Sequence, residues 1–121
     1  AYTTAKYGMS LVAHGLAEEL GKQNVASNCL WPRTSLDTAA VRNVIGEELV
    51  KGSRKPSIYA DAAYAVLKRD SSTCTGNFFL DQDVLEEEGI TDFDQYAIDP
   101  EATLVSDFFV DDNPEDWIQA L

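Results

Sequence analysis

The sequence predicts an α/β fold in which helices alternate with short strands and the sheet is incomplete within this chain. A helical repeat at the N-terminus runs directly into a short apolar segment of strand character, which is the order found in half of a βαβ unit. The 121 residues, 45% of them hydrophobic, suffice for one domain with a packed core. Only two segments have strand character, and two strands leave backbone groups unpaired along their edges. We therefore expect the missing strands to come from elsewhere.

The first predicted element is an amphipathic helix over residues 4–20, with Gly21 as its stop. Its apolar residues recur at spacings of three and four, which places them on one face: Ala5, Met9, Val12, Ala13, Leu16, Ala17 and Leu20. The next element is a strand over residues 25–31. Pro32 ends this strand, because a proline nitrogen cannot donate a hydrogen bond to a sheet.

The middle of the chain is predicted to be helical in two places. A less regular stretch is expected to form a helix over residues 38–50, followed by an exposed basic loop at residues 51–56. An alanine-rich helix over residues 58–67 follows, with one apolar side formed by Ile58, Ala62, Ala63, Val66 and Leu67.

The second predicted strand, residues 77–81, contains the run Phe78-Phe79-Leu80. Short helical turns are expected at residues 84–88 and end at Gly89. The order of elements is thus helix, strand, helix, helix, strand. We divide the chain into a domain over residues 1–100 and an acidic tail or linker over residues 101–121.

Charge and cysteine content exclude several classes of function. Nine Lys and Arg against 21 Asp and Glu give a net charge of −12, which disfavours nucleic acid partners. No apolar run approaches the roughly 20 residues that a membrane span needs, so we expect no such span. Cys29 and Cys74 are too few for a disulfide scaffold or a four-cysteine zinc site. They indicate free thiols in an intracellular compartment, with a single disulfide as the less favoured alternative.

Tyr2 and Lys6 form the motif to which we assign chemistry. They stand four positions apart, so both side chains emerge on one face of the first helix. A Lys6 ammonium ~4 Å from the phenol would favour the phenolate by about 4 kcal/mol at an effective dielectric of ~20, and so lower the pKa of Tyr2. Tyr2 could then donate a proton to a carbonyl. Tyr64 and Lys68 repeat the spacing, and a surface tyrosine packed along a lysine stem is the simpler interpretation of a bare pair.

Context favours the first pair. Residues 1–10 resemble the active-site helix of short-chain dehydrogenases/reductases, in which Tyr-x-x-x-Lys is followed by a small residue and a long helix. Asn28-Cys29-Leu30-Trp31-Pro32 matches the family's strand ending in Asn-x-x-x-Pro. Residues 60–81 are similar to its penultimate helix and last strand. The amino-acid sequences of residues 30–34 and 89–96 are most similar to those of the hydroxysteroid dehydrogenase-like subgroup.

This resemblance implies the C-terminal half of a Rossmann-like, doubly wound parallel sheet. It also implies an NAD(P)-dependent oxidoreductase acting on a carbonyl or alcohol of steroid-like or fatty-acyl type. Tyr2 would exchange a proton with the substrate, Lys6 would hold the ribose hydroxyls of NAD or NADP, and residues 33–56 would cover the substrate. The cofactor-binding residues implied are Tyr2, Lys6, Pro32, Arg33, Thr34 and Thr38. No metal is expected.

The sequence departs from the family in several ways. Arg33 stands where the family usually has glycine, and Thr38 lies one residue later than the usual threonine. No glycine-rich dinucleotide-binding loop is present, and the catalytic serine would precede Tyr2. We therefore expect the isolated chain to be inactive and to need the N-terminal half of the same domain. A catalytically idle binding or assembly module, motivated by Arg33, is the alternative, and an acidic interaction domain unrelated to reductases is a third interpretation.

The remaining candidates have structural interpretations. His14 is expected on the surface or at a subunit contact, and the acidic segment 81–94 lacks the pattern of a calcium loop. Trp31 is expected either to wall a nicotinamide pocket or to fill the core. Trp117, Ile118 and Leu121 are expected to dock on a neighbouring surface. The broad apolar face of the first helix implies, as in related enzymes, a homodimer or homotetramer. Cytoplasmic, mitochondrial and peroxisomal locations all stay open.

Overall fold

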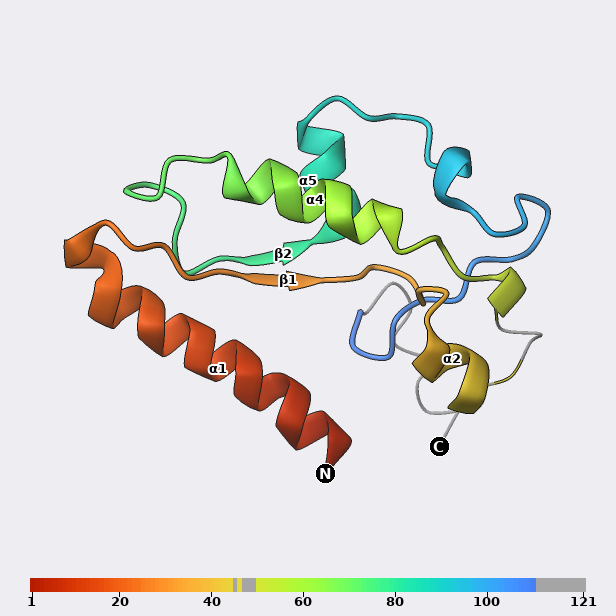
Figure 1. Cartoon of the computed structure of the whole chain (residues 1–121), viewed down its shortest axis with the longest axis horizontal. Coiled ribbons are helices and arrows are strands. Elements are labelled where there is room, and N and C mark those ends of the chain that lie inside the picture. The colour runs from red at the N-terminus through yellow and green to blue at the C-terminus, as the bar shows by residue number, and fades with distance from the viewer. Residues whose placement is uncertain (45, 47–49, 111–121) are drawn as a thin grey trace.

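The computed structural model describes residues 1–44, 46 and 50–110, and a two-stranded parallel sheet lies at its centre (Figure 1). Strand β1 (Cys29–Trp31) pairs with β2 (Phe78–Leu80), so that Leu30 lies opposite Phe79. Helix α1 (Tyr2–Leu20) lies on one side of this sheet, and α4 (Ser57–Leu67) and α5 (Asp81–Glu87) lie on the other. The arrangement confirms the predicted α/β fold and its order of elements.

Helix α1 contacts the rest of the chain through a narrow stripe. Ser10 and Ala17 are buried and Ala13 is half-buried, whereas the apolar side chains of Met9, Val12 and Leu16 are exposed. A single turn of 3-10 helix, η1 (Gly21–Gln23), follows where Gly21 was predicted to stop the helix. Much of the predicted apolar face is therefore free of contacts within the described part of the chain.

Strand β1 is shorter than the predicted segment 25–31. Before it, the side chain of Asn28 takes backbone partners on the neighbouring segment. Its Nδ2 donates to the carbonyl of Cys74 at 2.9 Å, and its Oδ1 accepts the N–H of Asn77 at 3.0 Å. Because an asparagine side chain can replace the backbone in such bonds, the regular ladder begins only at Cys29.

The segment 51–56 was predicted to be an exposed basic loop. Lys51, Lys55 and Pro56 are exposed, but the prediction is wrong for the residues between them. Gly52, Ser53 and Arg54 are buried. Arg54 donates its backbone N–H to Ser35 at 2.9 Å and accepts the N–H of Asp37 at 2.9 Å. These bonds draw the segment against the loop after β1. Before it lies α2 (Ala39–Val44), the described part of the helix predicted over residues 38–50; residues 45 and 47–49 lie outside the described residues.

The core lies between α4 and α5. It contains Ile58, Ala62 and Ala65 of α4, Val84 and Leu85 of α5, and Tyr96 of the 3-10 helix η2 (Asp94–Tyr96). Spacings of four and three turn one face of α4 inward, so Leu67, predicted on that face, is exposed. Helix α5 begins at Asp81, three residues before the predicted turns, and the carboxylate of Asp81 accepts the backbone N–H of Gln82 at 2.8 Å.

Residues 105–110 return to the loop that follows β1. Val105 donates its N–H to Gly52 at 2.9 Å, its carbonyl accepts the N–H of Ser35 at 2.8 Å, and Asp107 donates its N–H to Arg33 at 3.0 Å. This part of the predicted acidic tail therefore packs on the segment that was expected to cover the substrate. Trp117, Ile118 and Leu121 lie outside the described residues.

Candidate functional site

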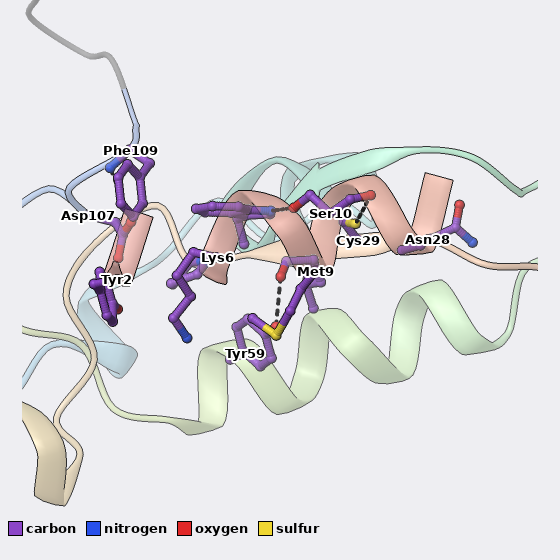
Figure 2. Close-up of a pocket in the computed structure, with 13 residues that line it drawn as sticks. Tyr2, Lys6, Met9, Ser10, Asn28, Cys29, Tyr59, Asp107 and Phe109 are labelled. Atoms are coloured by element: carbon purple, nitrogen blue, oxygen red, sulfur yellow. Dashed lines mark hydrogen bonds between the residues drawn. The ribbon is translucent and has the colours of Figure 1, made fainter. Parts of the chain in front are cut away.

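A cavity of about 350 Å³ opens between α1, β1 and α4 (Figure 2). Tyr2, Asp107 and Phe109 lie at one end of it, Asn28 lies at the other, and Lys6 lies between them. The lining residues are Tyr2, Lys6, Met9, Ser10, Ala13, Asn28, Cys29, Leu30, Trp31, Pro32, Tyr59, Asp107 and Phe109. The cavity thus collects the start of α1, the end of β1 and a late segment of the chain.

Both predicted catalytic residues line this cavity. They lie one helical turn apart on α1, and Lys6 Nζ is 5.4 Å from the centroid of the Tyr2 ring. The ammonium lies over the ring, which is the geometry of a cation–π contact. The predicted sharing of one face by Tyr2 and Lys6 agrees with this geometry. Their role in catalysis stays a prediction.

Tyr64 and Lys68, which have the same spacing at the end of α4, can be compared with Tyr2 and Lys6 within the same chain. Lys68 Nζ lies 5.3 Å from the centroid of the Tyr64 ring, so the two pairs have nearly identical local geometry. Tyr2 and Tyr64 are similarly exposed, at 61% and 66%, but neither Tyr64 nor Lys68 lines this cavity. Surroundings, and not the spacing itself, distinguish Tyr2 and Lys6.

Trp31 is held against helix α1. Its indole Nε1 donates to Ser10 Oγ at 3.1 Å, and its ring lies 5.7 Å from that of Tyr7, centroid to centroid. Ser10 is one of the buried residues of α1, and its hydroxyl accepts the indole N–H of Trp31, so this buried polar side chain has a hydrogen-bond partner. Trp31 therefore lines the cavity and packs against α1 without belonging to the core cluster, and its place beside a nicotinamide stays a prediction.

Of the other predicted cofactor residues, Pro32 alone lines the cavity. Arg33 is turned toward α5, where its guanidinium pairs with Asp83 at 2.5 Å. Thr34 is buried and pairs with Ser106 in an antiparallel bridge. Thr38 Oγ1 accepts the N–H of Val41 at 3.4 Å at the start of α2. The proposed contacts of Arg33, Thr34 and Thr38 with a cofactor stay predictions.

A buried carboxylate anchors the loop that contains these residues. Asp81 Oδ1 accepts the backbone N–H of Arg33 at 2.8 Å. Burial raises the pKa of Asp81, although its two backbone hydrogen bonds and the charges of Arg54 and Arg33 act in the opposite direction. Arg54 is also buried, and burial lowers the pKa of its guanidinium, which donates to Gln82 Oε1 at 2.6 Å.

Tyr59, Asp107 and Phe109 are among the cavity residues that sequence reasoning did not assign to a site. The Tyr59 hydroxyl donates to the carbonyl of Leu30 at 2.7 Å, and burial raises the pKa of this phenol. Asp107 and Phe109 lie about a hundred positions after Tyr2, and no local pattern links them to it. The paired phenylalanines at 108–109, within an acidic segment, were the available signal.

Other candidate chemistry finds no support among the described residues. They contain no group of three or more His, Cys, Asp or Glu side chains that could hold a metal ion. Cys29 and Cys74 are free thiols, and the His14 ring lies 5.7 Å from that of Phe78. No helix in the described part of the chain has the length and apolarity to cross a membrane.

Curated proteins of one kind match almost the whole chain, whereas no protein-family model matches it. Hydroxysteroid dehydrogenase-like protein 2 of Danio rerio is 50% identical over 119 residues, which cover 98% of this chain and 28% of that protein. The protein of the same name from Homo sapiens is 49% identical over 115 residues, 95% of this chain and 27% of that protein. The chain thus spans little more than a quarter of the length of these relatives.

Solved structures agree with this likeness. A short chain dehydrogenase from Mycobacterium thermoresistibile superposes with a TM-score of 0.81 at 52% sequence identity, over 96% of this chain and 42% of that one. A Xanthomonas campestris protein, provisionally described as a dehydrogenase, superposes with a TM-score of 0.83 at 49% identity, over 89% of this chain and 39% of that one. The likeness therefore extends to both sequence and fold, and covers part of each solved chain.

Proposed function

Because this chain belongs, over the segment that it spans, to the short-chain dehydrogenase/reductase family and its hydroxysteroid dehydrogenase-like subgroup, we propose that it carries the catalytic helix of an NAD(P)-dependent oxidoreductase. The substrate is a carbonyl compound or an alcohol, on a steroid-like or fatty-acyl skeleton. The complete site also needs the N-terminal half of the domain, since two short strands do not form a stable sheet.

Tyr2 is the proton donor and acceptor in this proposal. In the reductive direction its hydroxyl donates a proton to the substrate oxygen, and in the oxidative direction its oxygen accepts that proton. The positive charge of Lys6, held over the Tyr2 ring, favours the phenolate that reduction leaves behind. The nicotinamide, when bound, supplies or accepts the hydride.

The residues around Lys6 fit one end of a nicotinamide nucleotide. An ammonium that lines a cavity of about 350 Å³ can donate hydrogen bonds to ribose hydroxyls, and Pro32 contributes apolar surface to the same cavity. Arg33 and Thr34 fit less well, because the Arg33 N–H is bonded to Asp81 and Thr34 is bridged to Ser106. We therefore assign cofactor contacts to Lys6, Tyr2 and Pro32 first.

The observation that carries this proposal is that Tyr2 and Lys6 face one cavity together with Pro32, whereas Tyr64 and Lys68 line no part of it. This contrast provides a matched experiment. In the full-length protein that contains this chain, turnover of a panel of ketones with NADH or NADPH is measured for Tyr2→Phe and Tyr64→Phe. We expect Tyr2→Phe to lower kcat by roughly 10²–10⁴-fold, the usual size of acid–base catalysis, and Tyr64→Phe to leave it unchanged.

A catalytically idle module is the competing function. It is favoured by Arg33, which stands in place of the family's glycine and whose side chain is held against Asp83. This alternative predicts that the full-length protein binds its partner equally well with Tyr2 or Phe at position 2 and turns over no carbonyl substrate. Absence of turnover in the wild-type protein would reject the enzyme proposal in its favour, whereas equal, measurable kcat values in the two tyrosine variants would reject the catalytic role of Tyr2.

Two further features belong to the proposal. A second copy of the chain is expected to pack against the exposed apolar face of α1, in a homodimer or homotetramer. The two free thiols favour a reducing, intracellular compartment.

A further inference from the structure

Residues 105–110 form a wall of the cavity beside Tyr2. The Phe109 ring lies 6.2 Å from the ring of Tyr2, 5.2 Å from that of Tyr7 and 5.6 Å from that of Trp31, centroid to centroid. Backbone bonds to Gly52, Ser35 and Arg33 hold the rest of the segment in place. The wall is thus built from several independent contacts, and it covers the end of the cavity where Tyr2 lies (Figure 2).

Asp107 gives this wall a negative charge. Among the thirteen described residues that line the cavity, it is the acidic one, and its side chain is half-buried. Burial raises the pKa of Asp107, with Asp81 acting in the same direction, whereas Lys6 and the N–H of Phe109 lower it. Lys6, whose charge acts on Asp107, is the cation of the same lining, and Trp31, Pro32 and Phe109 contribute apolar surface to it.

The next step rests on the proposed function. There, Lys6 faces the ribose of the cofactor, and the Tyr2 hydroxyl meets the reacting oxygen of the substrate. Figure 2 places Asp107 and Phe109 at the Tyr2 end of the cavity, and places Asn28 and Cys29 at the other end, beyond Lys6. The wall therefore borders the space of the substrate rather than that of the ribose.

We infer that residues 105–110 determine substrate specificity, by admitting uncharged apolar carbonyl compounds or alcohols and excluding those with a carboxylate near the reacting carbon. Phe109 offers apolar surface to the substrate, and Asp107 repels an anionic group. Repulsion is effective here because a half-buried charge is poorly screened by salt.

Asp107→Asn tests the charge without changing the shape. Asp107 Oδ1 accepts the N–H of Phe109 at 3.3 Å, and an asparagine oxygen can do the same. In the full-length protein, kcat/KM is measured for a 2-keto acid and for its uncharged methyl ester. We expect wild type to prefer the ester, and Asp107→Asn to raise the acid-to-ester ratio about tenfold. Glu101→Gln, the same charge change at an exposed site outside the cavity, should leave the ratio unchanged.

Neighbouring phenylalanines provide a second pair of variants. Phe109→Leu should raise KM for the ester with little change in kcat, whereas Phe108→Leu, at an exposed side chain outside the cavity, should alter neither constant. If Asp107→Asn does not fold, the wild-type preference and the two leucine variants still decide the question.

The outcomes separate the two proposals. Turnover that depends on Tyr2, with wild type using acid and ester equally or with an unchanged ratio in Asp107→Asn, would overturn the inference and leave the proposed function intact. A change confined to the KM of the dinucleotide would also overturn it, because the wall would then face the cofactor. Turnover that is absent, or that survives Tyr2→Phe, would overturn both.

Discussion

The carboxylate of Asp81 is completely buried and joins two elements that are far apart in sequence. One of its oxygens accepts the N–H of Arg33 in the loop after β1 and the N–H of Gln82 in the first turn of α5, both at 2.8 Å. Its other oxygen has no hydrogen-bond partner among the described residues. Because burial raises the pKa of Asp81, the charged form is held in the fold at a disadvantage that its partners only partly offset.

Two substitutions of Asp81 should behave differently. Asp81→Ala leaves two backbone donors without an acceptor and is expected to lower the free energy of unfolding by about 2–4 kcal/mol. Asp81→Asn retains an acceptor oxygen. A carboxyl whose pKa is raised on folding stabilises the fold most below its ordinary value of 3.8 and loses that contribution as the pH rises through the raised value.

The free energy of unfolding of Asp81→Asn should therefore rise relative to that of wild type between pH 4 and pH 7. Urea unfolding of both variants and of wild type at these two pH values measures the differences. A stability gap between wild type and Asp81→Asn that does not change with pH would contradict the assignment of burial as the dominant influence.

Local patterns predicted some residues of the site and missed others. A spacing of four on one helix placed Tyr2 and Lys6 together, because helix geometry alone decides which side chains share a face. The Asn-x-x-x-Pro segment likewise led to Pro32. Asp81, Asp107 and Tyr59 depend on contacts between distant segments, and a single sequence carries no record of such pairings.

Gly52 controls how closely the cavity wall approaches the loop after β1. A Cβ at this position would lie 2.4 Å from the carbonyl oxygen of Thr103 and 2.8 Å from Val105 Cγ2. The Gly52 carbonyl also accepts the N–H of Val105. Any side chain at position 52 would therefore push the segment that leads to Asp107 and Phe109 away from its support.

Gly52→Ala is expected to lower the free energy of unfolding by about 1–3 kcal/mol, the usual result of overpacking. In the full-length protein it should also raise KM for apolar substrates, since the wall is displaced. Gly21→Ala is the matched control, because a Cβ there meets nothing within 4 Å and its backbone is helical. Thermal unfolding and steady-state kinetics of the two variants test this, and equal behaviour would contradict it.

The elements themselves were largely predictable, and the errors have physical causes. Helix α4 and strand β2 lie within a residue of their predicted bounds, because apolar periodicity and flanking turns define them locally. The loop at residues 51–56 was misjudged in its middle, because its basic residues suggested exposure, whereas residues 52–54 are buried and Arg54 pairs through its backbone with Ser35 and Asp37. Backbone pairing between distant segments, and not the basic composition of the loop, therefore decides which of its residues are buried.

At the scale of the whole molecule, the exposed face of α1 is the largest departure from an ordinary helix packed on a sheet. Met9, Val12 and Leu16 recur on one side of the helix and are all exposed, while Ser10, Ala13 and Ala17 make the contacts with the rest of the chain. A row of exposed apolar side chains of this kind usually marks a surface that packs against a partner.

We expect the protein to be a homodimer or homotetramer that depends on this row. Val12→Asp should shift the mass measured by light scattering toward the monomer, because it places a charge in an apolar contact. Leu67→Asp introduces the same charge at an apolar residue of α4 that is even more exposed, 83% against 62%, and should leave the mass unchanged. A wild-type protein that is already monomeric, or equal masses for both variants, would argue against this interface.

The hydrogen bond from Tyr59 to Leu30 affects how the outer edge of β1 avoids pairing with strands of other molecules. Cys29 donates its N–H to Asn77, so Cys29 turns toward β2 and the backbone groups of Leu30 turn toward the outer edge of β1. Such an edge invites aggregation by pairing with strands of other molecules. The Tyr59 hydroxyl donates a hydrogen bond to the Leu30 carbonyl, so this acceptor is not open to a strand of another molecule. A strand that pairs correctly with β1 would replace this bond with a bond from its own backbone N–H.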